Sequence, residues 1–205
     1  MSDSTESLDL VVYGGSFDPP HAGHVESAKA ALARFPGARL VVTPAPAPAG
    51  AAGVHKHPTA PFPARLELCR LAFASLDGKV EVSDIEVTLP RPNFTVTTLK
   101  AFKNRFLKTT LGFLMGQDQW ESLARWKDPD EIARLARLIV VPRTGAQALA
   151  SESVTRWPAV LLPERVSEAS STKIREDLGA GRKLPAGWLP EAVDAYIRNN
   201  HLYGT

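Results

Sequence analysis

Glycines and histidines are concentrated in residues 13–24, which read Tyr-Gly-Gly-Ser-Phe-Asp-Pro-Pro-His-Ala-Gly-His. An apolar run over 8–13 predicts a buried strand, and residues 24–35 carry apolar side chains at the spacing of one helix face. We therefore predict a glycine-rich turn from a strand into a helix. The first turn of a helix has backbone N–H groups without partners and a partial positive charge, so this turn is suited to bind an anion.

Four residues of the predicted turn suit a phosphate in particular. Gly14 and Gly15 would let the backbone approach the anion closely. His21 and His24 lie three residues apart, so their imidazoles could donate hydrogen bonds to the same anion. The alternative, a tight turn with two ordinary histidines, stays open on these residues alone.

The string from Gly15 to His24 resembles the G-[TS]-F-D-P-x-H-x-G-H signature of the nucleotidyltransferase superfamily. The resemblance implies that the turn binds ATP and that the two histidines are catalytic. It assigns nucleotide contacts to Gly14, Gly15, Ser16 and Phe17. It does not by itself name the second substrate.

Residues 170–175, Ser-Ser-Thr-Lys-Ile-Arg, are predicted to open another helix. They could be a serine cap followed by two surface cations, but they also resemble the second signature of the superfamily, S-S-T-x-I-R. The resemblance gives Ser171 and Thr172 contacts with the nucleotide and gives Arg175 a catalytic role on the phosphates. A guanidinium can form two parallel hydrogen bonds with phosphate oxygens.

Two further segments are similar to one branch, the nicotinate mononucleotide adenylyltransferases. Ser-Asp-Ile-Glu at 83–86, followed by 94–99, resembles that branch's S-D-x-E … Y-T-x-x-T-L. Phe94 replaces the usual tyrosine, so a hydroxyl is lost while the ring remains. The resemblance assigns Phe94 and Thr95 to the substrate.

Residues 116–126 resemble the branch's G-x-D-x-x-x-x-L-x-x-W pattern. It implies nucleotide contacts from Gly116 and Asp118 and stacking of Trp126 on the pyridine ring. Without the resemblance, Asp118 would be interpreted as a helix cap and Trp126 as a core residue.

Three cations are harder to place. Lys56 follows a proline-rich stretch, 44–53, where a solvated loop is the simple interpretation, but the resemblance implies a catalytic lysine that reaches the phosphates. Arg65 lies in the first turn of a predicted helix, where it either faces a bound anion or is a surface residue. Arg143, after the strand predicted at 138–141, is assigned to substrate binding.

Composition excludes several classes of protein. The net charge is +2, from 24 basic and 22 acidic residues, which does not favour binding to nucleic acid or to an anionic membrane. The one cysteine cannot form a disulfide within the chain. No leader peptide or membrane-length apolar run is recognised, so we expect a cytoplasmic protein.

Strands and helices are predicted to alternate along most of the 205 residues. The expected fold is α/β, a Rossmann-like, doubly wound parallel sheet with a small helical C-terminal part. We expect one nucleotidyltransferase domain over 1–205, with a disordered tail at 1–7 and a helical subregion at 166–205. The predicted strands are 8–13, 38–43, 79–87, 110–115, 138–141 and 159–162, and the predicted helices begin near 24, 61, 95, 128, 170 and 190.

The resemblance implies adenylyl transfer from ATP, with Mg²⁺, to nicotinate mononucleotide. Phosphopantetheine as the acceptor, or a regulatory module that binds nucleotide without catalysis, are the alternatives. The expected partners are these two small molecules, with monomer and homodimer both open.

Overall fold

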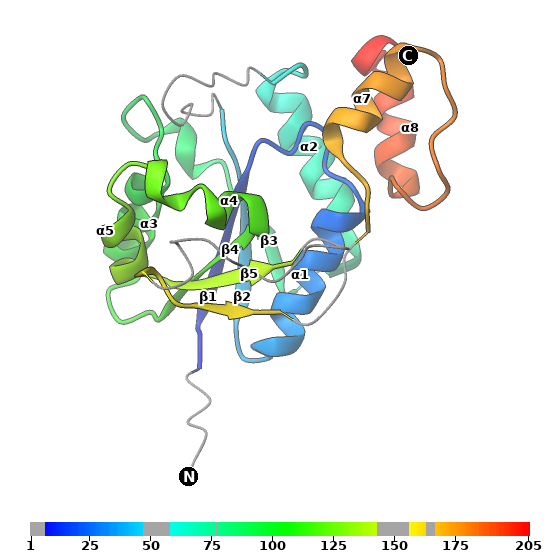
Figure 1. The fold of residues 1–205 in the computed structure, drawn as a ribbon. Coiled ribbons are helices and arrows are strands. Elements are labelled where there is room, and N and C mark those ends of the chain that lie inside the picture. The colour runs from blue at the N-terminus through cyan, green and yellow to red at the C-terminus, as the bar shows by residue number, and fades with distance from the viewer. Residues whose placement is uncertain (1–6, 47–57, 77, 143–155, 163–166) are drawn as a thin grey trace.

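The computed structural model describes residues 7–46, 58–76, 78–142, 156–162 and 167–205. Its centre is a six-stranded parallel sheet with the strand order β3-β2-β1-β4-β5-β6 (Figure 1). The strands are β1 Leu10–Gly15, β2 Arg39–Pro44, β3 Val80–Val82, β4 Leu111–Gly116, β5 Arg137–Val141 and β6 Ala159–Leu161. The predicted α/β class and the parallel sheet are confirmed.

The strand order reverses next to β1. The chain runs outward from β1 through β2 to β3, then returns to place β4 on the other side of β1. Tyr13 of β1 is in register with Val42 of β2 and with Leu114 of β4. In such open sheets, ligands bind where the loops after the two central strands diverge.

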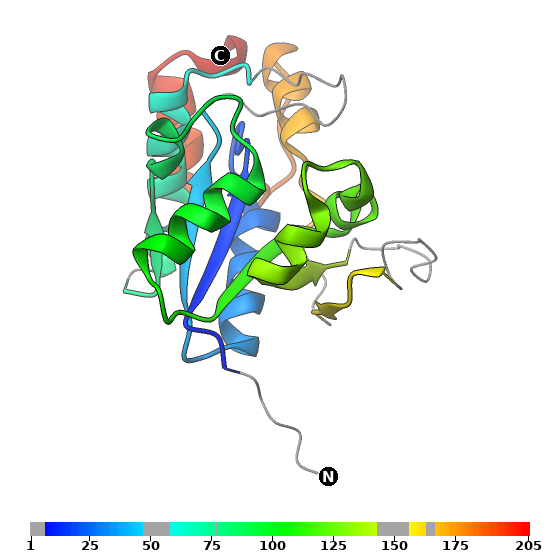
Figure 2. The same ribbon diagram turned by 90° about the vertical axis from the view of Figure 1, so that its left-hand side faces the viewer.

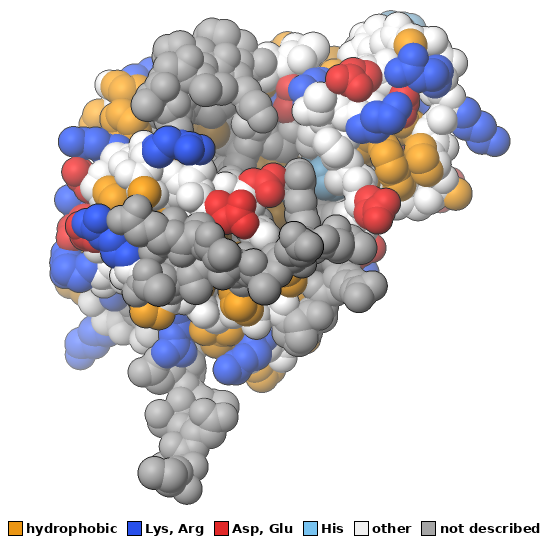
Figure 3. All heavy atoms as spheres, viewed as in Figure 1, with side chains coloured by type: hydrophobic (Ala, Val, Ile, Leu, Met, Phe, Trp, Pro, Cys, Tyr) orange, Lys and Arg blue, Asp and Glu red, His pale blue; other side chains and the backbone are white. Residues whose placement is uncertain are grey.

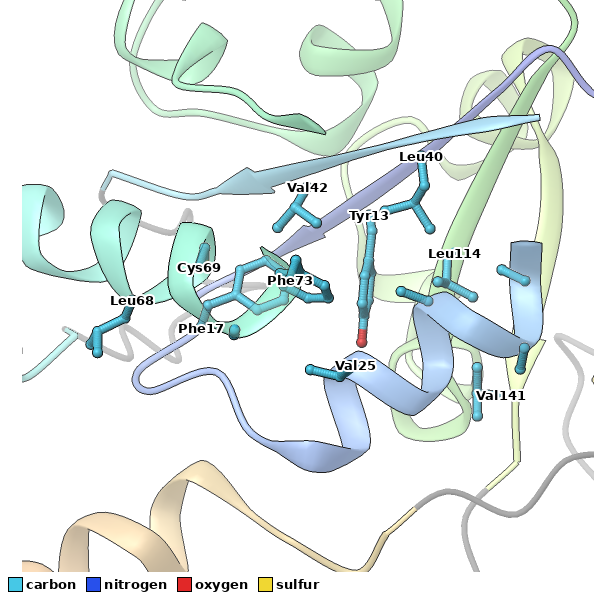
Figure 4. Close-up of a cluster of buried hydrophobic side chains, with 14 of the residues drawn as sticks. Tyr13, Phe17, Val25, Leu40, Val42, Leu68, Cys69, Phe73, Leu114 and Val141 are labelled. Carbon is cyan, nitrogen blue, oxygen red and sulfur yellow. The ribbon is translucent and has the colours of Figure 1, made fainter. Parts of the chain in front are cut away.

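Helices cover both faces of the sheet (Figures 1 and 2). The alternation of side chains along β1 separates two cores, because Val11 and Tyr13 belong to one cluster while Leu10 and Val12 belong to the other. The first cluster includes apolar residues of α1 (Ala22–Arg34) and α2 (Phe62–Phe73), and the second those of α3 (Thr95–Arg105) and α5 (Pro129–Leu135). Figure 4 shows the first cluster, in which Tyr13 points from the strands toward α1.

The C-terminal part consists of α7 (Ser171–Gly179), α8 (Glu191–Asn199) and the 3₁₀ turn η4 (Leu202–Gly204). Val193 and Ile197 of α8 are fully buried in the first cluster, as the apolar spacing predicted. α8 packs against α2, and η4 packs against α7. The tail is thereby attached to the helix that carries the second signature.

Two predictions from the sequence pattern are wrong. Apolar spacing from Thr95 onward predicts Phe106 on the buried face of the same helix, but α3 ends at Arg105 and the Phe106 side chain is 41% exposed. The sequence from Asp128 to Glu131 predicts Asp128 as the side-chain cap of α5, but its backbone is left-handed (φ 50°) and its side chain makes no capping hydrogen bond. Its carboxylate pairs with Lys127 instead.

Within the described ranges, no helix combines the length and the apolar character that a membrane crossing requires.

Gly112 of β4 is where a side chain should be hardest to accommodate. A Cβ atom there would lie 2.7 Å from Leu8 Cδ1 and 2.8 Å from Ile139 Cδ1, both in the buried core. We expect Gly112→Ala to lower the free energy of unfolding by about 1–2 kcal/mol, because the two side chains must shift. Urea denaturation measures this. Gly37→Ala is the control, since nothing lies within 4 Å of its Cβ position; equal stability of the two variants would contradict the packing argument.

Candidate active site

A cavity of about 1070 Å³ lies at the carboxyl ends of β1 and β4, which is the point where the strand order reverses. Figure 3 shows part of this hollow, with histidine surface inside it and acidic side chains beside it. Its size is slightly above the usual range for small-molecule sites, roughly 300–1,000 Å³. It is lined by residues of 13–18, 21–27, 116–119, 141–142 and 167–175, and by Pro58.

The turn after β1 packs on the buried aromatic ring of Phe17. Phe17 has a left-handed backbone (φ 46°), and its side chain is only 2% exposed. The ring makes edge contacts with Tyr13, at 5.3 Å between centroids, and with His24, at 5.0 Å. A Cβ on Gly15 would lie 3.1 Å from this ring, so Gly15 is needed for the ring to fold under the turn. Phe17 borders the cavity mainly as a packing residue.

His21 and His24 are brought together at the start of α1. Their ring centroids are 3.8 Å apart, and Nδ1 of His24 accepts a hydrogen bond of 3.2 Å from the backbone N–H of His21. In the neutral ring the proton of His24 is therefore on Nε2, which remains a donor. A Cβ on Gly23 would lie 3.2 Å from the His21 ring and 3.1 Å from the Ser167 carbonyl, so the glycine between the histidines provides space for both.

Both histidines are neutral at pH 7. Burial lowers the pKa of His21 to about 4, and burial followed by the nearby His21 lowers the pKa of His24 well below its usual value. Nδ1 of His21 is buried and has no hydrogen-bond partner among the described residues. The pair therefore offers polar N–H groups without a fixed positive charge.

The first turn of α7 is attached to the same loop from the far end of the chain. Ser171 Oγ donates to the Pro19 carbonyl (2.8 Å), and Arg175 Nη1 donates to the Asp18 carbonyl (2.6 Å). Arg175 Nη2 also lies 3.4 Å from Thr172 Oγ1. The two signature segments, about 150 residues apart in the sequence, thus border one cavity, with Arg175 between them.

Asp18 is a residue that the sequence analysis did not select. Its carboxylate accepts hydrogen bonds from the backbone N–H groups of Thr59 (2.6 Å) and Ala60 (3.0 Å) and from the Tyr203 hydroxyl (2.8 Å). It belongs to the first signature, which is the one available signal, but its partners lie 41 to 185 residues away.

Arg65 corrects both interpretations that the sequence suggested. It is 1% exposed and donates to the carbonyls of Ala60 (3.1 Å), Ser16 (2.6 Å) and Pro46 (3.1 Å). It is neither a surface residue nor directed at an anion. It connects the turn after β1 to the segment after β2 and to the start of α2.

Gly116 and Asp118 reach the cavity from β4. Gly116 is the N-cap of α4 (Gln117–Glu121), and its N–H donates to Gln119 Oε1 (3.0 Å). Asp118 lies in the first turn of this short helix and lines the cavity. Gln119, which the sequence analysis missed, carries no motif signal.

Phe94, Thr95 and Trp126 are not among the residues that line this cavity. Phe94 is the N-cap residue of α3 and Thr95 its first residue. Trp126 is half-buried, donates from Nε1 to Ser122 Oγ (3.2 Å) and makes an edge contact with Phe113. Phe94 and Trp126 pack against the same apolar cluster, on the α3 side of the sheet. Lys56 and Arg143 lie outside the described residues.

Comparison with known proteins agrees with this geometry. The sequence model of the cytidylyltransferase-like family matches residues 12–177. A curated protein from Thermus thermophilus, named probable nicotinate-nucleotide adenylyltransferase, is 34% identical over 198 residues, which are 96% of this chain and 100% of that one. A protein of the same name from Albidiferax ferrireducens is 36% identical over 200 residues, with 95% and 97% covered. The chain belongs to the nicotinate-nucleotide adenylyltransferases of the cytidylyltransferase-like family.

A solved structure of this family has the same fold. Plasmodium falciparum nicotinic acid mononucleotide adenylyltransferase complexed with NaAD superposes with a TM-score of 0.74 at 19% identity, covering 96% of this chain and 97% of that one. The two folds therefore agree over nearly the whole chain, including the C-terminal part that lies beyond residues 12–177.

The depressed pKa of His21 predicts how stability depends on pH. The ring is neutral in the folded protein to about pH 4, whereas in the unfolded chain it takes up a proton near pH 6.5. Between these two values the unfolded chain binds more protons than the folded protein. The free energy of unfolding is therefore unaffected by the titration of His21 above about pH 6.5 and decreases as the pH falls toward 4. Between pH 7.5 and pH 5 this amounts to a loss of about 2 kcal/mol. Urea unfolding of wild type and His21→Asn at both pH values measures it, because titrating groups remote from His21 cancel in the difference. His24 is retained in both proteins, and burial is the main cause of its lowered pKa.

The wild type should lose about 2 kcal/mol more than the variant over that pH interval. Equal losses would mean that His21 is solvated and protonated in the folded protein.

Proposed function

We propose that this chain, as one nucleotidyltransferase domain over 1–205, transfers the adenylyl group of ATP to the 5′-phosphate of nicotinate mononucleotide. The products are nicotinate adenine dinucleotide and pyrophosphate. Membership of the nicotinate-nucleotide adenylyltransferases supports the reaction. The observation that carries the proposal is that the His21–His24 turn and the first turn of α7 border the same cavity.

The chemistry requires positioning more than proton transfer. An oxygen of the mononucleotide phosphate, already ionised at neutral pH, attacks the α-phosphorus of ATP. A new P–O bond forms while the bond to the bridging oxygen between the α- and β-phosphorus breaks, and pyrophosphate leaves with that electron pair. Because no proton must be removed from the nucleophile, the protein has to hold the two phosphates in line and stabilise the charge.

His24 is assigned to the α-phosphate. Its Nδ1 is occupied by the His21 backbone N–H, so its Nε2–H is the donor toward an oxygen of the α-phosphate. His21 lies beside it. Gly14, Gly15 and Ser16 approach the nucleotide with their backbone, and Gly116 and Asp118 border its ribose.

The leaving pyrophosphate is assigned to the α7 end of the cavity. The first-turn N–H groups of this nine-residue helix, including that of Ser171, can donate to phosphate oxygens there, as can the Thr172 hydroxyl and the Arg175 guanidinium. The Ser171 hydroxyl already donates to the Pro19 carbonyl. Lys56 is assigned to the same β- and γ-phosphates on the sequence pattern alone.

Mg²⁺ is proposed to arrive with ATP. No group of three or more metal-ligating side chains occurs among the described residues, and this fits an ion held chiefly by substrate phosphates and water. When bound, the ion neutralises phosphate charge.

The pyridine ring is assigned to Trp126 and Phe94, with Arg143 as a further contact. Phe94 cannot cap α3 through its side chain, since a phenyl ring has no acceptor for the first N–H groups. The start of α3, at Thr95, therefore favours the nicotinate carboxylate over a neutral amide.

The direct test is pyrophosphate release with ATP and each of three acceptors: nicotinate mononucleotide, nicotinamide mononucleotide and phosphopantetheine. We expect release with the first and much less with the others. A preference for phosphopantetheine, or no release with any acceptor, would overturn the proposal.

His24→Ala is expected to lower kcat by roughly 10²–10³-fold while changing the KM for either substrate little, because its contact strengthens as charge develops in the transition state. Steady-state kinetics in both substrates measure this. His24→Gln is the matched variant, since it keeps a polar donor without the ring. If His24→Ala retained wild-type kcat, the reacting phosphate would lie elsewhere.

Trp126→Ala is expected to raise the KM for nicotinate mononucleotide about tenfold and to leave the KM for ATP unchanged, because it removes one ring stack worth on the order of 1 kcal/mol or more. Trp126→Phe keeps a ring and should lose much less. If Trp126→Ala instead lowered the melting temperature and weakened both substrates equally, Trp126 would be a core residue only.

A further inference from the structure

Three chain segments meet at the carboxylate of Asp18. One oxygen accepts the Tyr203 hydroxyl (2.8 Å) and the Ala60 N–H (3.0 Å), and the other accepts the Thr59 N–H (2.6 Å). Asp18 is 4% exposed and Tyr203 is 9% exposed. A buried carboxylate needs its donors, because a lost hydrogen bond is not replaced by water.

Arg175 is attached to the same residue. Its Nη1 donates to the Asp18 carbonyl (2.6 Å) and lies 3.9 Å from the nearer carboxylate oxygen. Arg65 is the other cation in this region, but its guanidinium already donates to three backbone carbonyls. Arg175 is therefore the cation that the Asp18 carboxylate would attract if it lost a donor.

Tyr203 is itself fixed by the C-terminal turn. Its backbone is left-handed (φ 60°), an uncommon conformation for a large side chain that persists where the surroundings determine it. The next residue, Gly204, packs so closely on Gly179 of α7 that a Cβ there would lie 3.2 Å from the Gly179 Cα. The C-terminal turn thus packs on α7, the helix that carries Arg175. The Tyr203 hydroxyl reaches the loop that carries Asp18.

We propose that Tyr203 is a positioning residue for the phosphate-binding part of the site. By donating to Asp18, it keeps the carboxylate from capturing Arg175, so the guanidinium stays available for the phosphates of ATP. Tyr203 does not line the cavity and so acts through Asp18 and Arg175. The inference rests on the proposed function in one respect, that Arg175 contacts ATP.

Tyr203→Phe tests this, because it removes the hydroxyl and keeps the buried ring. We expect the Kd for ATP, measured by calorimetry, and the KM for ATP to rise about tenfold. The KM for the mononucleotide should stay within about twofold, since Phe94 and Trp126, which are assigned to it, lie on the α3 side of the sheet. Two variants are the controls. Tyr196→Phe removes a hydroxyl that does not contact Asp18, and Ile197→Val loosens the packing of α8. Both should leave the Kd and the KM for ATP unchanged.

The decisive measurement repeats Tyr203→Phe in an Arg175→Ala background. If Tyr203 acts through Arg175, Tyr203→Phe should change the Kd for ATP by less than about twofold when Arg175 is already replaced by alanine. An equal effect in both backgrounds, or an unchanged Kd in Tyr203→Phe, would overturn the inference. Calorimetry measures ATP binding without turnover. If the wild type bound ATP but did not transfer its adenylyl group, the proposed function would be overturned, and the role of Tyr203 in ATP binding would still be tested.

Discussion

The reversal of strand order beside β1 is the constraint on which the site depends. Parallel strands end at the same edge of the sheet, and the segments that follow β1 and β4 leave that edge toward opposite faces. The space between them cannot be filled by either segment, so a cavity forms there. Gly14 and Gly15 from one strand and Gly116 from the other border it. Residues of α1, α4 and α7 and the end of β5 supply much of the rest of its lining.

Two buried charges stabilise the loops around the cavity by binding backbone groups. Arg65 donates to three carbonyls and Asp18 accepts from two N–H groups, and both residues contact Ala60. These segments have no strand partners of their own, so side chains must satisfy their polar groups. Both charges therefore stabilise the loops. Among the described residues, Arg175 is the cation that lines the cavity.

The histidine pair shows how packing determines chemistry. Ordinary histidines would be partly charged near pH 6.5, but burial lowers the pKa of both rings, so both are neutral donors at pH 7. Neutral rings do not repel each other at 3.8 Å between centroids. In the proposed reaction, other groups would therefore have to neutralise the phosphate charge. The close approach depends on Gly23, because a side chain there would displace the His21 ring.

The α/β class, the approximate positions of the six strands and the two signature segments that border the cavity could be predicted from the sequence, because apolar periodicity and short motifs are local properties of the chain. The sequence could not determine that Asp18 contacts Thr59 and Tyr203, or that Arg65 is buried, because those contacts join residues between 19 and 185 positions apart. The conformations of Phe17 and Asp128 also depended on the tertiary structure, since a left-handed backbone at a non-glycine residue is imposed by its surroundings. Local patterns identify which residues can bind phosphate, and long-range packing decides which of them are presented to it.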